Sequence, residues 1–182
     1  MGKFFKSYKI NLYFNEKSIE ENYTAESTPV YNPDGSIDCN INIDMSKFST
    51  EVSDEFVAST IIHEISHMLI ATTFTNASDY NKNDREKNML INYVSKMKTF
   101  LVDNFNTDPK HALSMIFSGL KWLSEGPGSN QVYKFWSQET EDMYFKIITD
   151  NGLSLVYGDE NYFTIYDEKF KNGTLGNKSC KF

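Results

Sequence analysis

The first third of the chain alternates between apolar and polar positions. Residues 37–43 do so strictly, with isoleucine or cysteine at each odd position and aspartate or asparagine between them, which predicts a strand with one buried face. Residues 28–44 are expected to form a hairpin around Asn32-Pro33-Asp34-Gly35, because Pro33 presets φ and Gly35 accepts a positive φ. Residues 9–14 alternate more loosely and predict an earlier strand. We therefore expect a small antiparallel sheet before residue 53.

Beyond residue 53 the apolar positions change to a helical spacing. The first helix is expected from about Ser53 to Phe74, with Ser53 as its N-cap and Asp54 and Glu55 in the first turn, where the helix dipole favours acidic groups. Its broad apolar face consists of Ala58, Ile61, Ile62, Ile65, Met68 and Leu69, and the opposite stripe of Phe56, Ser59, Thr60, His63, His67 and Ile70. A helix with so apolar a face is predicted to be buried.

Three further helices and a late hairpin complete the expected architecture. The helices are predicted at 84–104, from Pro109 onward, and at 138–149, with a break at 126–130 and a hairpin pairing 153–157 with 162–166. The pattern thus predicts an α+β fold in one domain spanning 1–182. Residues 1–52 would be mainly strand, 53–150 mainly helical, and 151–182 a hairpin and tail.

Composition and charge narrow the function classes. The 182 residues include 18 Lys and Arg against 25 Asp and Glu, a net charge of −7, which disfavours binding to nucleic-acid phosphates. Neither a membrane-spanning apolar run nor a signal peptide is recognisable, so we expect a cytoplasmic protein without a membrane partner. The two cysteines, Cys39 and Cys180, are far apart and indicate neither a disulfide framework nor a cysteine zinc site.

The candidate chemistry lies in His63-Glu64-Ile65-Ser66-His67, an HExxH motif. Two histidines four residues apart on a helix point from one face, so both imidazoles can reach a single Zn²⁺. Glu64 projects from the edge of that face, where it can take a proton from a water whose pKa zinc has lowered. Two buried histidines satisfied by hydrogen bonds are the alternative interpretation.

A zinc site of this kind needs a third protein ligand. The metzincin extension is excluded, because Ile70 and Thr73 stand where it requires glycine and histidine. Glu86 is the candidate, since it lies in the first turn of the second predicted helix at the centre of an apolar stripe, and a buried carboxylate needs a partner. Alternatively, Glu86 bonds back to Asn83 in a capping box. The rival ligands are His111, expected at the surface, and Glu139 and Glu141, expected to serve a helix dipole.

The residue that stabilises the oxyanion is less well defined by the sequence. Tyr93 shares the predicted helix face of Glu86, and Tyr133 and Tyr144 are alternatives. Each of the three is also a reasonable core or rim aromatic residue. The strand 37–43 is either an ordinary sheet strand or the edge along which an extended peptide pairs through its backbone.

The stretch from Ile41 to about Trp122 resembles small HExxH metallopeptidases of the zincin-like, SprT-like or minimal gluzincin type, known from bacteria and tailed phages. The similar segments are INIDMSKF, VASTIIHEISHMLIA, DREKNMLINYVSKM and ALSMIFSGLKWL. The resemblance implies a zincin-like fold with His63 and His67 as zinc ligands and Glu64 as the base. It departs at Glu86, where such proteins tend to carry a histidine, and the chain lacks the basic or zinc-ribbon additions of proteases that act on DNA-bound substrates.

Motif and resemblance together predict a zinc-dependent endopeptidase that hydrolyses a peptide or protein substrate. Zinc would be held by His63, His67 and Glu86, with Glu64 and Tyr93 as the catalytic residues. The alternative, from another functional class, is a structural component of a phage virion or tail that keeps the fold with weak or no catalysis and assembles into a larger complex.

Overall fold

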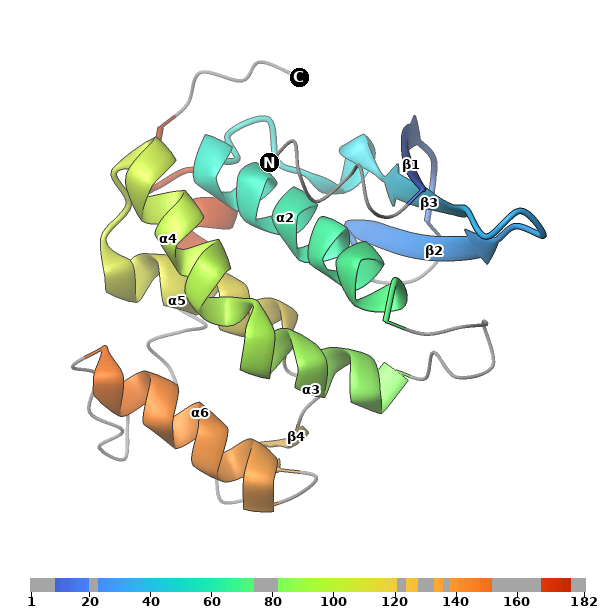
Figure 1. Ribbon diagram of the computed structural model, residues 1–182. Helices are drawn as coiled ribbons and strands as arrows, with labels where there is room; N and C mark the ends of the chain where they lie inside the picture. Colours follow the sequence, from blue (N-terminus) through green and yellow to red (C-terminus); the bar gives the residue numbers. More distant parts are fainter. Residues whose placement is uncertain are drawn as a thin grey trace.

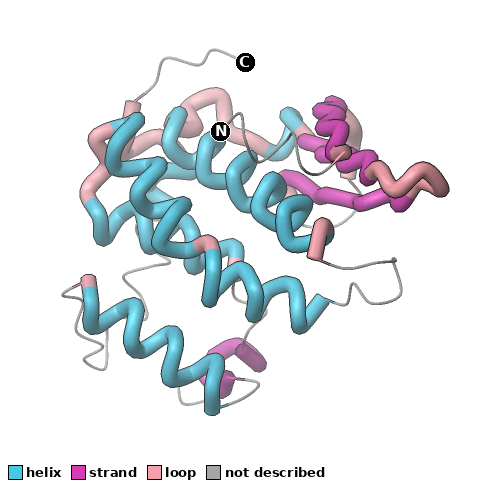
Figure 2. The backbone as a smooth tube through the Cα atoms, viewed as in Figure 1, coloured by secondary structure: helices cyan, strands magenta, loops and turns pink. Residues whose placement is uncertain are grey.

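A computed structural model describes residues 9–19, 23–73, 82–120, 124–127, 133–135, 138–151 and 168–177, which form an α+β structure (Figure 1). Its elements, in chain order, are β1 (Ile10–Glu16), β2 (Ala25–Tyr31), β3 (Ile37–Ile43), the 3₁₀ turn η1 (Met45–Lys47), α2 (Asp54–Ala71), α3 (Lys82–Asn92), α4 (Val94–Phe105), α5 (Pro109–Gly119), β4 (Ser124–Pro127), β5 (Tyr133–Phe135) and α6 (Gln138–Asp150). The first three strands gather on one side of the molecule and the helices occupy the other (Figure 2).

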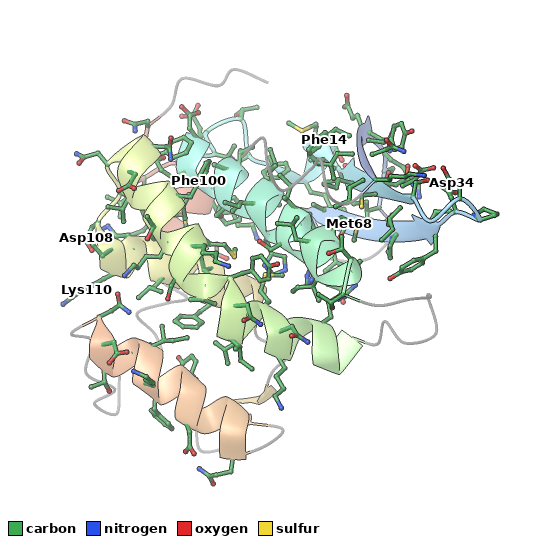
Figure 3. All side chains as sticks on the ribbon, viewed as in Figure 1. Phe14, Asp34, Met68, Phe100, Asp108 and Lys110 are labelled. Atoms are coloured by element: carbon green, nitrogen blue, oxygen red, sulfur yellow. The ribbon has the colours of Figure 1, made fainter. Side chains whose placement is uncertain are left out.

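The predicted hairpin is confirmed as β2 and β3, which pair antiparallel. Gly35 adopts φ +79° in the turn and donates its N–H to the Asn32 carbonyl at 3.0 Å. The Asp34 side chain, at the tip labelled in Figure 3, accepts a hydrogen bond from the Ser36 N–H at 2.9 Å. The Asp34 side chain and the Gly35 backbone N–H thus close the turn in the way that this tetrapeptide predicts.

The expectation of a purely antiparallel sheet is wrong, because β1 runs parallel to β3. The strand order is β1-β3-β2, so the hairpin takes one edge of β3 and β1 takes the other. The same order decides between the two interpretations of residues 37–43: β3 is the central strand of the described sheet, an ordinary sheet strand and not an edge that pairs with a peptide. Alternation of side chains fixes which face of a strand is buried, but not which neighbour it takes or in which direction.

Helix α2 lies between the sheet and the other helices, and it is buried from both sides. Ser53 is its N-cap, as predicted, and its hydroxyl accepts the Phe56 N–H at 3.2 Å. Ile65 and Met68 pack with Cys39 and Ile41 of the sheet, whereas a separate set of side chains, Ala58, Ile61 and Ile62, packs against the large helical core. The apolar face predicted as one surface is therefore divided between two clusters. Met68 is labelled in Figure 3.

The single helix predicted at 84–104 is in fact two, α3 and α4, joined at Tyr93. Tyr93 has φ −123° and ψ −27°, yet its N–H still bonds to the Met89 carbonyl at 2.9 Å and its carbonyl accepts the Met97 N–H at 2.8 Å. The hydrogen-bonded ladder thus continues through a kink. Both halves pack on α2, but α3 also contacts α6 and α4 also contacts α5, so the two halves follow different neighbours.

The remaining predicted helices are confirmed by α5 and α6. Pro109 opens α5, and the Asp108 side chain caps it by accepting the Lys110 N–H at 2.8 Å. The strands β4 and β5 pair antiparallel around the predicted break and were not expected. The predicted hairpin at 153–166 lies outside the described residues. Among the helices described, none combines the length and apolar character needed to cross a membrane.

The C-terminal segment, residues 168–177, closes over the first turn of α2. The Ser53 N–H bonds to the Phe170 carbonyl at 3.0 Å, and the Asp54 N–H bonds to the Asn177 carbonyl at 2.9 Å. The buried Glu55 carboxylate accepts hydrogen bonds from the Asn177 N–H and from its side-chain Nδ2, each at 2.9 Å. Donors at the helix N-terminus, which lack partners within the helix, are satisfied by a segment from the far end of the chain.

Candidate metal centre

The three side chains of the HExxH motif gather on the second half of α2, near the end that Met68 marks in Figure 3. His67 is only 3% exposed and Glu64 8%, while His63 is partly buried. One nitrogen of each histidine and one oxygen of Glu64 lie within 4.8 Å of one another. Within the described residues, the spacing predicted from the sequence therefore produces a compact group of two imidazoles and one carboxylate.

The two imidazole rings converge on a common point. Their Nε2 atoms lie 2.9 Å apart, and the ring planes are nearly perpendicular, at 86°. Two neutral rings can share this contact only if one Nε2 carries the proton and the other accepts it. A cation between them would let both nitrogens offer a lone pair at once.

Burial keeps both histidines neutral. It lowers the pKa of His63 to about 4, with a further contribution from the positive charge of Arg85. Burial also lowers the pKa of His67 well below its ordinary value, followed by the effects of His63 and Arg85. Since only a neutral imidazole can ligate a metal, both side chains are in the ligating form at neutral pH.

The spacing of these nitrogens fits a zinc ion. Two ligands of a tetrahedral zinc, each about 2.0–2.1 Å from the ion, are about 3.3 Å apart, so the observed 2.9 Å requires the rings to separate by a few tenths of an ångström. The Nδ1 atom of His63 is buried and has no hydrogen-bond partner among the described residues. A donor set of two imidazoles with a nearby carboxylate is one that zinc accepts.

The surroundings of Glu64 raise the pKa of its carboxyl above the ordinary value. Burial raises the pKa of its carboxyl, the nearby Ser27 hydroxyl and the Arg85 charge lower it, and Glu26 raises it slightly. Ser27 approaches from β2, although its buried hydroxyl makes no hydrogen bond of regular geometry among the described residues. A buried carboxyl with a raised pKa is suited to accept and return a proton near neutral pH.

Arg85 is the residue that the sequence analysis missed. It lies in α3, is partly buried, and affects the pKa of all three motif side chains. One signal was present in the sequence, because Arg85 precedes Met89, which is fully buried, by one helical turn. A charged residue on the buried stripe of a helix was thus a candidate partner for the motif.

The carboxylates predicted as third ligands belong to helices α3 and α6. Glu86 belongs to α3, as predicted, but its side chain lies outside the described residues, as do those of Glu139 and Glu141 in α6. Because α3 begins at Lys82, Asn83 lies within the helix and not at its N-cap, which removes the geometry of a capping box. Zinc ligation by Glu86 stays a prediction.

His111 is placed away from the motif. Its ring packs against Phe170 at a centroid distance of 5.7 Å, and the Phe170 carbonyl bonds to Ser53 at the start of α2. Ser53 precedes His63 by roughly ten residues, or about 15 Å along a helix axis. His111 is also partly buried rather than at the surface, and burial lowers its pKa.

The tyrosines predicted for the oxyanion lie in varied surroundings. Tyr93 lies at the kink between α3 and α4, packs against the helical core, and has the Lys96 Nζ 4.8 Å from its ring centroid. Tyr144 packs against Phe117 at 4.9 Å. The side chain of Tyr133 lies outside the described residues. A catalytic role for Tyr93 stays a prediction.

Comparisons with known proteins do not assign this chain to a family. The chain matches no model of a protein family, and neither a curated protein nor a solved structure is significantly similar to it. The functional argument therefore depends on the side chains themselves.

Proposed function

We propose that the protein is a zinc-dependent endopeptidase. One observation carries the proposal: the two Nε2 atoms of the motif converge to 2.9 Å on a buried helix, with the Glu64 carboxylate in the same group. Both imidazoles are neutral and the pKa of Glu64 is raised. Neutral nitrogen ligands beside a carboxyl base are what metal-assisted hydrolysis requires.

The side chains divide the work between binding and proton transfer. His63 and His67 would hold zinc through Nε2, and Glu86 is proposed as the third ligand. When bound, zinc supplies a Lewis acid that polarises a carbonyl and lowers the pKa of water. Glu64 takes the proton from the attacking water and then delivers it to the amine that leaves.

The proposed substrate is an extended peptide. Ser27 brings β2 alongside Glu64, and β2 is an edge strand of the described three-stranded sheet. Backbone groups on an edge strand can pair with an extended chain. A peptide bound there would lie next to the base that cleaves it.

The substitution Glu64→Gln tests the mechanism. It preserves shape and hydrogen bonding but removes the proton acceptor, so the variant is expected to bind about one zinc per chain and to lose cleavage by roughly 10²-fold or more. Metal content is measured on untreated protein, and cleavage on a fluorescent casein. Glu16→Gln makes the same chemical change at an exposed position of β1 and should leave both properties intact.

Two results would contradict the proposal. Cleavage by Glu64→Gln at the parental rate would show that this carboxyl is not the base. If the parent protein and the Glu64→Gln variant both bind zinc but neither cleaves casein, the metal has a structural role. That result would favour the alternative function, a non-catalytic component of an assembly.

A further inference from the structure

The outer edge of β1 is open in the described sheet. Along its other edge the Ile37 N–H donates to the Lys9 carbonyl at 2.8 Å, and the Lys17 N–H donates to the Ile43 carbonyl at 3.1 Å. Alternate residues of a strand bond to opposite sides, so the odd positions of β1 bond to β3. The even positions turn their backbone N–H and C=O groups outward, where no described strand pairs with them. They are Ile10, Leu12, Phe14 and Glu16.

The edge formed by β2 cannot offer an equally continuous row of donors. The Asn32 N–H donates to the Ser36 carbonyl, and the Asp44 N–H donates to the Thr24 carbonyl, each at 2.9 Å. The even positions of β2 therefore face β3, and the odd positions, which include Pro29, face outward. Pro29 has no N–H, and a proline of this kind commonly limits pairing along an edge strand. Strand β1, with the sequence INLYFNE, contains neither proline nor lysine.

The open edge of β1 is flanked by exposed aromatic side chains. Tyr13 is 47% exposed and Phe14 is 52% exposed. Alternation places Phe14 on the same face as Ile10 and Leu12, which pack with the small apolar cluster between the sheet and α2. Helix α2 packs mainly on β2, at the other edge of the sheet. An apolar strand with an open edge is a site where another strand can pair.

We propose that β1 pairs with β1 of a second copy of this chain. The two strands would run antiparallel about a two-fold axis at Leu12, and the two described three-stranded sheets would become one continuous sheet. A second copy is the occupant that this edge fits, because the strand is complementary to itself in one register. The proposal does not rest on the peptidase function.

The register follows from the side chains of β1. A slip of one residue would place each side chain on the wrong face. With Leu12 opposite Leu12 of the second copy, Ile10 lies opposite Phe14, so every pair on the face toward α2 is apolar. The small apolar cluster would then continue across the axis. On the other face Asn11 lies opposite the exposed ring of Tyr13.

The neighbouring registers match less well. With the axis at Tyr13, Lys9 lies directly opposite Lys17, and like charges in such positions destabilise a strand pair. A further shift in that direction places the Glu16 carboxylate opposite the apolar Leu12. A shift in the other direction shortens the ladder and loses hydrogen bonds. The axis at Leu12 therefore gives the best match.

The size of the contact predicts a weak dimer. An aromatic side chain can bury about 150–250 Å², so two rings that are half exposed contribute roughly 150–250 Å² per copy. Both copies together, with their backbones, fall short of the roughly 1,200 Å² at which stable interfaces begin. We expect a dissociation constant on the order of 1–100 µM.

Sedimentation equilibrium across this concentration range tests the association. Phe14→Lys places a charge against the apolar Ile10 of the second copy and should weaken the dimer at least about tenfold. Val30→Lys makes a matched change at a residue that is 45% exposed on β2, and it should leave the dissociation constant within about twofold. Thermal unfolding of both variants checks that each is folded.

Cysteine cross-linking tests the register without disrupting the apolar pairs. Odd positions of the two strands form pairs without hydrogen bonds, with Cα atoms about 4.5 Å apart, which a disulfide can span. An Asn11→Cys protein mixed with a Tyr13→Cys protein should therefore form a covalent dimer when oxidised with diamide. Each variant oxidised alone contains the same native cysteines and should remain largely monomeric on a denaturing gel.

Three results would overturn the proposal. The parent protein could remain monomeric at ~1 mM, far above the expected dissociation constant. Val30→Lys could weaken association as much as Phe14→Lys does. Tyr13→Cys alone could cross-link as well as the mixture, which would place the axis elsewhere. Association should be the same with and without a zinc chelator, so each of these results leaves the peptidase proposal standing.

Discussion

Gly176 shows how strongly a single residue can be constrained by a neighbouring helix. It adopts φ +89°, a conformation that side chains with a Cβ rarely take. A Cβ at this position would lie 2.6 Å from the Ser53 Cβ and would also collide with the Glu55 carboxylate. Only glycine allows the C-terminal segment to approach the start of α2 this closely.

We predict that Gly176→Ala destabilises the protein more than Gly35→Ala does. Both residues have a positive φ, which costs a non-glycine residue about 1–2 kcal/mol, but a Cβ on Gly35 would meet nothing within 4 Å. The overpacking at Gly176 should add about 1–3 kcal/mol. Urea denaturation of both variants measures the difference in the free energy of unfolding. Equal values would show that the C-terminal segment moves away from the added Cβ without a loss of stability.

At the scale of elements, α2 is anchored at both ends by segments that are remote in sequence. Its first turn bonds to Phe170 and Asn177, and its last residue, Ala71, accepts a hydrogen bond from the Tyr31 hydroxyl at 3.0 Å. These contacts hold the helix in place against the sheet and the helical core. Because α2 is held in place, the side chains of the motif are also held in a fixed position, and a metal site needs ligands that are fixed in this way.

The Asn177 side chain provides a test of this anchoring. Asn177→Ala removes the Nδ2 hydrogen bond to the buried Glu55 carboxylate and is expected to lower the free energy of unfolding by about 1–3 kcal/mol. Asn172 belongs to the same segment, but its side chain bonds only to the exposed Thr174 in the described structure. Asn172→Ala should therefore cost about 0.5 kcal/mol. Equal losses in chemical denaturation would argue against the anchoring role.

At the scale of the whole molecule, α2 is the only described helix that packs on both core clusters, one against the sheet and one against the other helices. A metal held by α2 and, as proposed, α3 would join parts that are already packed together. Binding to the folded state alone stabilises that state by mass action.

Zinc is accordingly expected to raise the melting temperature of the whole protein. At a free concentration one hundred times Kd, the gain is about 2.7 kcal/mol, or roughly 5–10 °C for a chain of this size. Differential scanning calorimetry with and without zinc measures it, and magnesium at the same concentration should have little effect, since it prefers oxygen ligands. His67→Ala should lose the zinc-dependent shift, and a shift of equal size in that variant would place the ion elsewhere.

Features that depend only on residues close together in the sequence were predictable from the sequence. The hairpin turn, the Ser53 and Pro109 helix starts, and the shared face of His63 and His67 all follow from neighbouring residues, and the structure confirms them. The kink at Tyr93 was not predicted, because the hydrophobic spacing continues through it and the two halves follow different partners. The effect of Arg85 was missed because its charge acts on side chains of another helix.

By itself, then, the sequence determined the β2–β3 hairpin, the starts of α2 and α5, the turn chemistry and the motif, since each depends on the conformational preferences and spacing of nearby residues. Only the tertiary structure decided that β1 joins β3 in parallel, that α2 is buried from both sides, and that the charge of Arg85 in α3 acts on the histidines of α2. Those outcomes depend on which surfaces remain to be buried once the elements meet, and no local pattern contains that information.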